Sequence, residues 1–233
     1  MQGQLPHPHG WDRRGARPPS TPSRSTSTCP TPSGGRLGDV VPRPRTPPAA
    51  LAWRTPFGLF WLRAVDADDP AELDLVHRWM HRPHVAAFWR QEWSRPRMGR
   101  YLRDQLSGGV SRPCLGLLDG EPISYWELYR AAHDPLARAY EARPHDIGIH
   151  LLIGDAARTG RGLGTAQLSA VRRALFAADR RCSRLVAEPD VANLASIRAF
   201  ARAGFARVGD VALGGKTAAL MVAERADAVE ASG

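Results

Sequence analysis

Apolar residues recur with two different spacings along this chain, and the spacings predict where strands and helices lie. Short runs rich in β-branched, aromatic and other apolar residues are typical of strands, whereas apolar residues three and four positions apart mark one helix face. The predicted strands cover residues 58–65, 114–118, 122–129, 147–153, 184–188, 205–209 and 217–223. The predicted helices cover residues 71–80, 94–106, 167–178 and 194–203.

The order of these elements is β-α-α-β-β-β-α-β-α-β-β, and this order predicts the fold class. Three strands in succession form an antiparallel meander, and the helix at 167–178 makes a crossover to the next strand. We therefore expect an α/β (α+β) domain, in which one mixed sheet of about seven strands has helices on both sides. Asp119-Gly120 predicts a tight hairpin turn, while Ser94 and Asn193 predict helix caps.

The composition changes near residue 53, which marks the start of the predicted domain. The stretch before it is crowded with Pro, Ser, Thr, Gly and Arg, and through residue 50 it holds seven arginines against two aspartates. Such a segment buries too little apolar surface to offset the entropy of ordering. We expect a disordered tail over 1–52, a folded domain over 53–226 and a disordered end over 227–233. No aromatic stacking pattern accompanies the arginines of the tail, so a nucleic-acid partner is not expected.

Two further absences narrow the class of protein. No run of about 18 apolar residues predicts a membrane span, and no apolar segment follows the basic start as it does in a secretory signal. The three cysteines, Cys29, Cys114 and Cys182, lack metal-ligand spacing. We interpret them as reduced thiols of a cytoplasmic protein, and we expect no metal site.

An apolar strand runs through a glycine-rich loop into a helix, which is the arrangement of a phosphate-binding loop. Gly160, Gly162 and Gly164 let backbone N–H groups approach an anion, and the helix N-terminus adds a positive dipole end. Arg158 and Arg161 add two positive charges. No Lys-Ser/Thr follows the glycines and no βαβ unit precedes them, which excludes a nucleotide-hydrolase P-loop and a Rossmann fingerprint. Alone, the loop equally fits a turn that caps a helix; in this context it predicts a pyrophosphate-bearing cofactor on a different fold.

A stretch of thirteen residues, 193–205, resembles a motif of the GCN5-related N-acetyltransferases. It reads Asn193-Leu-Ala-Ser-Ile-Arg-Ala-Phe-Ala-Arg-Ala-Gly-Phe205, and the family's ending is N-x-x-[ST]-x-x-x-[FY]-x-x-x-G-F. The glycine loop is similar to the Q/R-x-x-G-x-G/A acyl-CoA loop of that family. Thr159 stands where Gln or Arg is usual, and Arg158 lies one residue earlier. The resemblance implies the fold of the family and acyl-CoA as co-substrate. The residues implied to bind acyl-CoA are Leu152, Ile153, Arg158, Gly160, Arg161, Gly162, Leu163, Gly164, Thr165, Asn193 and Ser196.

Within that family, the chain most resembles the siderophore-biosynthesis acyltransferases, which acylate the N-hydroxylated side chain of lysine in aerobactin- and mycobactin-type siderophores. The resemblance runs from about Leu59 to Glu224. The stretches that carry it are 79–85 with Phe88-Trp89, 125–134, 146–153 and 187–190. In that group the His of the D-x-G-x-H strand lies in the substrate pocket, which implies this place for His150. The acid that opens the [DE]-P-D turn is the proposed general base, which implies this role for Glu188.

The chemistry of acyl transfer fits these two residues. The reaction requires a neutral nitrogen nucleophile, a route for its proton and stabilisation of the developing oxyanion. Glu188 ends one predicted strand and His150 lies on its neighbour, so both side chains can face one cleft. Alternatively, Glu188 only caps the end of its strand, and His150 is an ordinary packed histidine of the core. The candidates for the wall of the acceptor pocket, or else for ordinary core, are His84, Trp89, Trp93, Tyr125 and His150.

We therefore expect a cytoplasmic N-acyltransferase that moves an acyl group from acyl-CoA to the N6-hydroxylamine or amine of a lysine-derived siderophore precursor. Glu188 would act as general base in a direct attack on the thioester. Two alternatives stay open. One is an aminoglycoside 6′-N-acetyltransferase, whose cleft would be strongly acidic, and the other is an acyl-CoA-binding module that does no catalysis. The expected partner is a small-molecule acceptor, and the chain is expected to be a monomer or homodimer.

Overall fold

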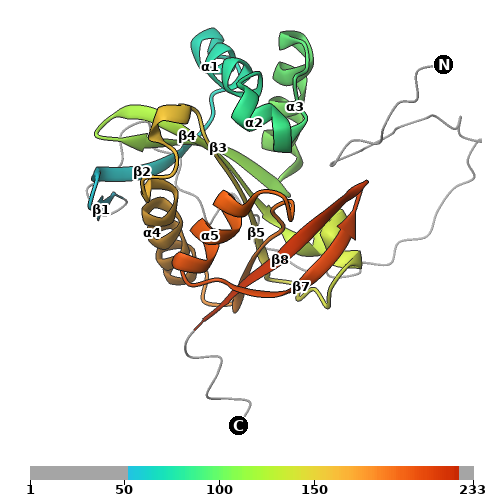
Figure 1. Cartoon of the computed structure of the whole chain (residues 1–233). Helices are drawn as coiled ribbons and strands as arrows, with labels where there is room; N and C mark the ends of the chain where they lie inside the picture. Colours follow the sequence, from blue (N-terminus) through green and yellow to red (C-terminus); the bar gives the residue numbers. More distant parts are fainter. Residues whose placement is uncertain (1–51, 226–233) are drawn as a thin grey trace, which may run out of the picture.

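The computed structural model describes residues 52–225 of the 233-residue chain. The predicted tail, 1–52, lies outside these residues except for Ala52, and so does the whole predicted end segment, 227–233. Within the described part, eight strands form one sheet with helices on both faces (Figure 1). The predicted α/β (α+β) class is confirmed, with one strand more than expected because β1, which is three residues long, was missed.

The bounds of the elements agree closely with the predicted ranges. The strands are β1 Trp53–Thr55, β2 Gly58–Ala64, β3 Ser111–Leu118, β4 Glu121–Arg130, β5 Ile147–Ile153, β6 Arg184–Ala187, β7 Ala206–Leu213 and β8 Lys216–Glu224. The helices are α1 Pro70–Met80, α2 Pro83–Trp89, α3 Arg95–Gly108, α4 Leu163–Ala178 and α5 Leu194–Arg202. Three short 3-10 turns are η3 Ala131–His133, η4 Pro135–Arg138 and η5 Ala156–Arg158.

The strands lie in the order β1-β2-β3-β4-β5-β6-β8-β7. Strands β1 to β5 form an antiparallel meander, and the β5–β6 pair alone among the described strands is parallel. A parallel pair needs a crossover connection, and α4 supplies it. The meander and the crossover therefore meet at β5, which lies inside the sheet.

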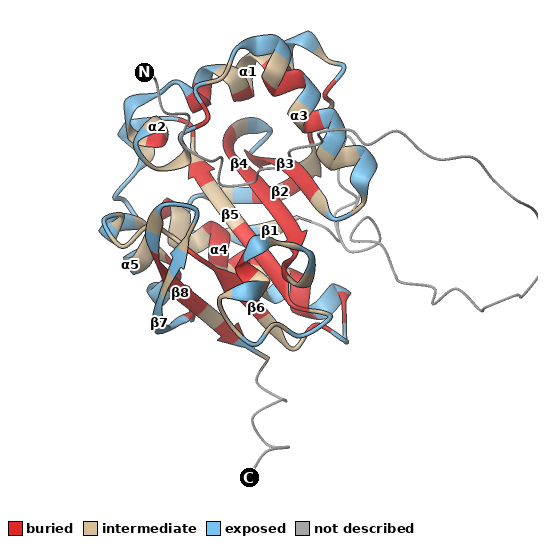
Figure 2. Cartoon of the chain, turned by 90° about the vertical axis from the view of Figure 1, so that its right-hand side faces the viewer, coloured by how far each residue is buried: buried red, intermediate tan, exposed pale blue. Residues whose placement is uncertain are grey.

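Two apolar clusters hold the helices against opposite faces of the sheet. Leu168 and Val171 of α4 pack with Ile149 of β5, whereas the buried side chains of α1, α2 and α3 pack with Leu152 of β5. Successive side chains of a strand point to opposite faces, so His150 and Leu152 share the α1–α3 face. Figure 2 shows that the strands in the middle of the sheet are mostly buried. A polar side chain on this face of β5 must therefore find partners inside the protein.

Local turn signals account for most element ends. Asp119 and Gly120 both have positive φ, 49° and 92°, and they connect β3 to β4 as predicted. The Asn193 side chain caps α5 by accepting from the Ser196 N–H at 3.1 Å. Ser94 occupies the N-cap position of α3, but its side chain makes no capping hydrogen bond, so the predicted cap is only positional. Helix α2 was not predicted; Pro83 opens it at a first-turn position, where a missing N–H costs nothing.

No helix between residues 52 and 225 is long and apolar enough to cross a membrane. Over the same residues, no group of three His, Cys, Asp or Glu side chains is placed to hold a metal ion. Cys114 and Cys182 are buried free thiols, and burial raises the pKa of Cys182 to about 11. The third cysteine, Cys29, lies outside the described residues.

Candidate active site

The central strands β5 and β6 diverge at the place where the candidate catalytic residues lie. β5 and β6 pair at two positions, the second of which is Gly148–Val186. β5 continues to Ile153, whereas β6 ends directly before Glu188. Pro189 follows, and proline has no N–H with which to continue a ladder. Beyond Gly148 the edge of β5 is therefore not paired by β6, and Glu188 stands at the point of separation.

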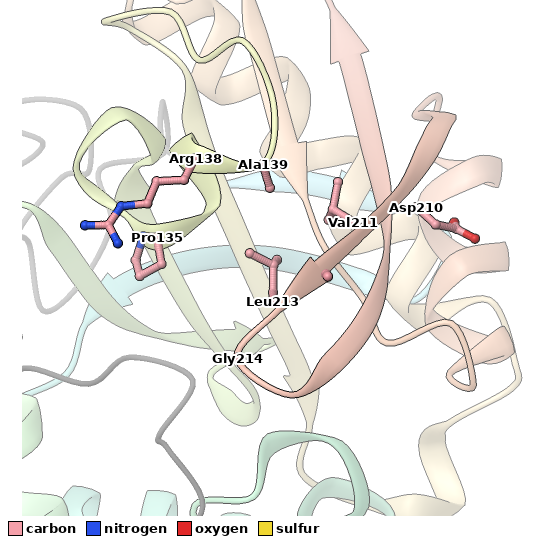
Figure 3. A pocket seen from close by; sticks show the side chains of 8 residues that line it. Pro135, Arg138, Ala139, Asp210, Val211, Leu213 and Gly214 are labelled. Atoms are coloured by element: carbon pink, nitrogen blue, oxygen red, sulfur yellow. The ribbon is translucent and has the colours of Figure 1, made fainter.

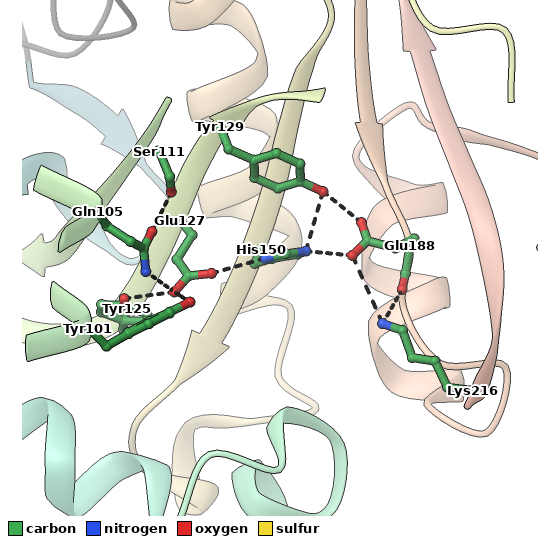
Figure 4. Close-up of polar contacts among 9 residues, drawn as sticks. All are labelled: Tyr101, Gln105, Ser111, Tyr125, Glu127, Tyr129, His150, Glu188 and Lys216. Carbon is green, nitrogen blue, oxygen red and sulfur yellow. Dashed lines mark hydrogen bonds and ion pairs between the residues drawn. The ribbon is translucent and has the colours of Figure 1, made fainter. Parts of the chain in front are cut away.

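His150 lies between two carboxylates at this point (Figure 4). Its Nε2 is 2.5 Å from Oε1 of Glu188, and its Nδ1 is 3.1 Å from Oε2 of Glu127. The Tyr129 hydroxyl donates to Oε2 of Glu188 at 2.9 Å and lies 3.3 Å from the His150 Nε2. The structure thus brings together the two residues that the sequence singled out for catalysis, and it adds Glu127 and Tyr129 to them.

The two carboxylates, and not burial, determine the charge of His150. The side chain of His150 is 16% exposed, and those of Glu127 and Glu188 are 3% and 5% exposed. Burial disfavours the imidazolium, but the charges and hydrogen bonds of Glu188 and Glu127 outweigh burial and raise the pKa of His150 to about 10. His150 is therefore an imidazolium at neutral pH. Lys216 adds a second positive charge, since its Nζ lies 3.9 Å from Oε1 of Glu188 and donates to the Glu188 carbonyl at 3.0 Å.

Glu127 belongs to this polar group and was not among the residues predicted from the sequence. It is paired with His150 in the β4–β5 register, and its Oε1 accepts three hydrogen bonds of 2.9 Å, from the hydroxyls of Tyr101 and Tyr125 and from Nε2 of Gln105. The available signal was an acid inside an aromatic strand, which implies a buried charge that needs partners. Its α3 donors lie 22 and 26 residues away in sequence, and no spacing rule links them to β4.

Gly148 gives Tyr129 the room to reach Glu188. A Cβ on Gly148 would lie 2.1 Å from Cζ of Tyr129, so the phenol ring lies directly across this glycine. Burial, and then the charge of Glu188, raise the pKa of Tyr129 well above its usual value. The hydroxyl therefore stays protonated and donates to the carboxylate. The glycine of the D-x-G-x-H stretch is thus explained by contact with a ring on the neighbouring strand.

The glycine loop has the geometry of an anion site. Gly160 and Gly162 have positive φ, 72° and 87°, a backbone conformation that strongly favours glycine. Gly162 is the N-cap of α4, no side-chain cap bond is made there, and the first turn of the helix begins with Leu163, which is buried. The helix hydrogen-bond ladder starts with Ala166 N–H to the Gly162 carbonyl, so the preceding N–H groups point out of the helix end. The loop and helix end therefore fit a phosphate group.

The other predicted cofactor residues lie around this helix end in different roles. Arg158 makes a two-pronged ion pair with Glu121, at 2.9 and 2.8 Å, so its charge is balanced locally, whereas Arg161 is exposed. Ile153 lies close to Gly164, because a Cβ on that glycine would meet its Cδ1 at 3.6 Å. Leu152 is buried, Thr165 is half-buried in the first turn of α4, and Asn193 and Ser196 form the cap of α5.

Only part of the predicted acceptor wall gathers at His150. The Trp89 ring lies edge-on to His150 and to Tyr125, with centroids 6.0 and 5.6 Å apart. His84 lies at the far end of β5, where its Nε2 is 2.9 Å from the Ile153 carbonyl. Trp93 packs against Tyr101, which bonds to Glu127, and carries the Arg97 guanidinium 4.2 Å above its ring.

A surface hollow of about 470 Å³ lies beside this group, between η4 and β7 (Figure 3). Val211 and Leu213 line it and pack in the same apolar cluster as Tyr129. The side chains of Arg138 and Asp210 at its rim point away from one another. The hollow holds none of the predicted site residues, so the candidate site rests on the polar group around His150.

Comparison with known proteins identifies the family of this chain. The profile of the acetyltransferase (GNAT) domain matches residues 68–213. Lysine N-acyltransferase MbtK of Mycolicibacterium paratuberculosis is 39% identical over 175 residues, which are 75% of this chain and 76% of that protein. The N(6)-hydroxylysine O-acetyltransferase of Escherichia coli is 31% identical over 159 residues, which are 68% of this chain and half of that protein.

A solved structure supports the same assignment. The crystal structure of the aminoglycoside acetyltransferase AAC(6′)-Ib with coenzyme A and kanamycin aligns with a TM-score of 0.65 and 29% identity. The alignment covers 74% of this chain and 98% of that one. With a family match over most of the described residues and a relative of 39% identity along three quarters of the chain, the protein is a member of the GCN5-related N-acetyltransferase family and an N-acyltransferase.

Proposed function

We propose that this enzyme transfers an acyl group from acyl-CoA to the N6-hydroxylamine, or the N6-amine, of a lysine-derived siderophore precursor. The relatives support the acceptor class, since one is named a lysine N-acyltransferase and another an N(6)-hydroxylysine O-acetyltransferase. The observation that carries the proposal is the Glu188–His150 pair at the point where β5 and β6 separate.

In the proposed reaction, the acceptor nitrogen attacks the thioester carbonyl while Glu188 takes the proton of that nitrogen. The C–N bond forms, the C–S bond breaks, and CoA leaves as a thiolate that takes a proton from solvent. A hydroxylamine is less basic than an alkylamine, so its nitrogen is largely neutral near neutral pH and needs only a modest base. Tyr129 and His150 hold the Glu188 carboxylate by hydrogen bonds of 2.9 and 2.5 Å, which fixes its orientation.

The binding sites follow from the same geometry. The pyrophosphate of acyl-CoA would lie on the N–H groups of the Gly160–Thr165 segment, with Arg161 as the nearby unbalanced charge. The pantetheine arm would run along the edge of β5 at Leu152 and Ile153. Trp89 and Tyr125 would form the acceptor wall next to His150, whereas His84 and Trp93 support that wall from behind.

The test is the release of CoA thiol with a panel of acyl-CoAs against N6-hydroxylysine, lysine and kanamycin. We expect turnover with hydroxylysine or lysine, and a loss of about 100-fold or more in kcat for Glu188→Gln, the range expected on removing a general base. The matched control is Glu224→Gln, which makes the same change at an exposed position at the end of β8. Turnover of Glu188→Gln within threefold of the wild-type enzyme would refute Glu188 as the base.

Aminoglycoside 6′-N-acetylation is the second candidate, because AAC(6′)-Ib has the same fold and aminoglycoside N(6′)-acetyltransferase type 1 of Klebsiella pneumoniae is 31% identical over 159 residues. A polycationic acceptor requires carboxylates that are available to it. Here Glu127 and Glu188 are engaged by His150 and by tyrosine hydroxyls, which favours the lysine-type acceptor. Turnover with kanamycin alone would reverse this choice.

A further inference from the structure

Glu127 is a buried carboxylate whose two oxygens have different partners. Oε1 accepts from Tyr101, Gln105 and Tyr125, and Oε2 faces Nδ1 of His150 at 3.1 Å. An ionised carboxylate accepts at both oxygens, and three donors on Oε1 stabilise its negative charge, whereas a protonated acid is a weaker acceptor. The surroundings from α3 and β4 are therefore built for the ionised form of Glu127, although the residue is 2% exposed.

This arrangement dictates how the His150 ring is held. An ionised Glu127 can only accept at Oε2, so it requires a hydrogen on Nδ1 of His150, and Nε2 is the nitrogen that faces Glu188. Three further residues lie around the ring. Tyr129 lies on the β4 side, the Trp89 ring of α2 covers one edge, and Lys216 of β8 lies beyond Glu188.

The charges on either side of the ring affect the proposed base. A cation 2.5 Å from Glu188 favours the ionised carboxylate and so weakens it as a base. The carboxylate of Glu127 at the opposite nitrogen favours the imidazolium, whose Nε2–H can donate to Glu188. Glu127 thus preserves the hydrogen bond that orients the Glu188 carboxylate while it keeps the ring in place.

We propose that Glu127 is a positioning residue of this site: with Glu188 it keeps both ring nitrogens of His150 protonated, so that the Nε2–H donates to Glu188 and holds that carboxylate in place to take the proton of the acceptor nitrogen. This inference rests on the proposed function, because it assumes that Glu188 is the base. Glu127 itself need not contact the acceptor or acyl-CoA. Its contribution is made through His150.

The test follows His150 directly by ¹⁵N NMR titration of the imidazole in the full-length enzyme without acceptor, together with steady-state kinetics. Glu127→Gln keeps the size of the side chain and removes its charge. We expect the titration midpoint of His150 to move from about 10 toward 6.5 in this variant. We also expect kcat to fall at least about 10-fold, less than for removal of the base itself, with the KM for acyl-CoA unchanged within twofold. Glu224→Gln should change none of these quantities.

A second variant covers the case in which Glu127→Gln does not fold. Glu127→Asp keeps the charge, and we expect its His150 midpoint to stay well above 6.5. A folded Glu127→Gln enzyme with the wild-type midpoint, or a Glu127→Asp enzyme whose midpoint falls to 6.5, would overturn the role of Glu127. Because the titration needs no acceptor, it decides this role even if the proposed acceptor is wrong, and Glu188→Gln kinetics decide the base separately.

Discussion

Replacing Gly148 with alanine should disturb both the fold and the candidate catalytic carboxylate. The added Cβ would lie 2.1, 2.2 and 2.6 Å from Cζ, Cε2 and Cε1 of Tyr129. All three distances are too short, because Cβ atoms in proteins essentially never approach another heavy atom closer than 3.0 Å. The ring has little space to move, because Tyr129 is 3% exposed and its hydroxyl is bonded to Glu188. Either the ring or the β4–β5 pair must shift, and both routes alter the position of Glu188.

The expected losses of stability and of activity follow from two free-energy contributions. Overpacking of a well-packed interior costs about 1–3 kcal/mol, which in a domain of this size lowers the Tm by about 2–12 °C. A hydrogen bond to a charged group contributes about 1.5–3 kcal/mol, so its loss in the transition state would lower kcat/KM by about 10- to 150-fold.

Calorimetry and thiol-release kinetics on the purified variant measure both terms. The matched control is Gly108→Ala, since Gly108 is the last residue of α3 and a Cβ there meets nothing within 4 Å. That control should be neutral or slightly stabilising, because alanine is the better helix former. A Gly148→Ala enzyme with a Tm within 1 °C and kcat/KM within twofold of wild type would show that the Tyr129 contact has no consequence.

Three further predictions concern pH, a buried ion pair and the glycine loop. The pKa of His150 is raised from 6.5 to about 10 on folding, so the stability that His150 contributes is complete below pH 6.5 and is lost as the pH rises through 10. Between these two pH values, the Tm of His150→Gln should therefore fall less steeply with pH than the Tm of the wild-type enzyme. Arg184→Met leaves the fully buried Asp146 without its 2.7 Å partner and should cost about 3–5 kcal/mol in urea unfolding, part of which Asp146→Asn restores. Gly162→Ala should weaken acyl-CoA binding in calorimetric titration, whereas Gly215→Ala, at a similar φ of 86° in the β7–β8 turn, should not.

The fold was largely predictable because its elements have clear local signals. The apolar run at 147–153 gave the bounds of β5, and Asp119-Gly120 gave the β3–β4 turn. The failures have local causes as well. β1 is three residues long and carries no periodicity, and α2 is a seven-residue helix that begins at Pro83, directly after the predicted helix 71–80.

The site was predictable only where a sequence motif marks it. Glu188 and His150 were found because their neighbours in sequence form recognisable stretches, and the structure places them in contact. Glu127 was missed because its role depends on partners from α3 and β5, which only the folded chain brings together. The contact of Trp93 with Tyr101 was not predictable, because an aromatic residue near other aromatic residues in sequence does not reveal which of them its ring contacts.

Lys216, which donates to the backbone carbonyl of Glu188, is the one lysine in the whole sequence. An enzyme that acylates amines is exposed to its own reactive thioesters, and arginine side chains stay protonated and do not compete as nucleophiles. The chain therefore offers a single ε-amino group for self-modification, and that group lies at the proposed base. Intact-mass spectrometry of the wild-type enzyme and of Lys216→Arg after incubation with acyl-CoA measures how accessible the surroundings of Glu188 are to the acyl donor, since an acyl group on Lys216 is absent from the variant.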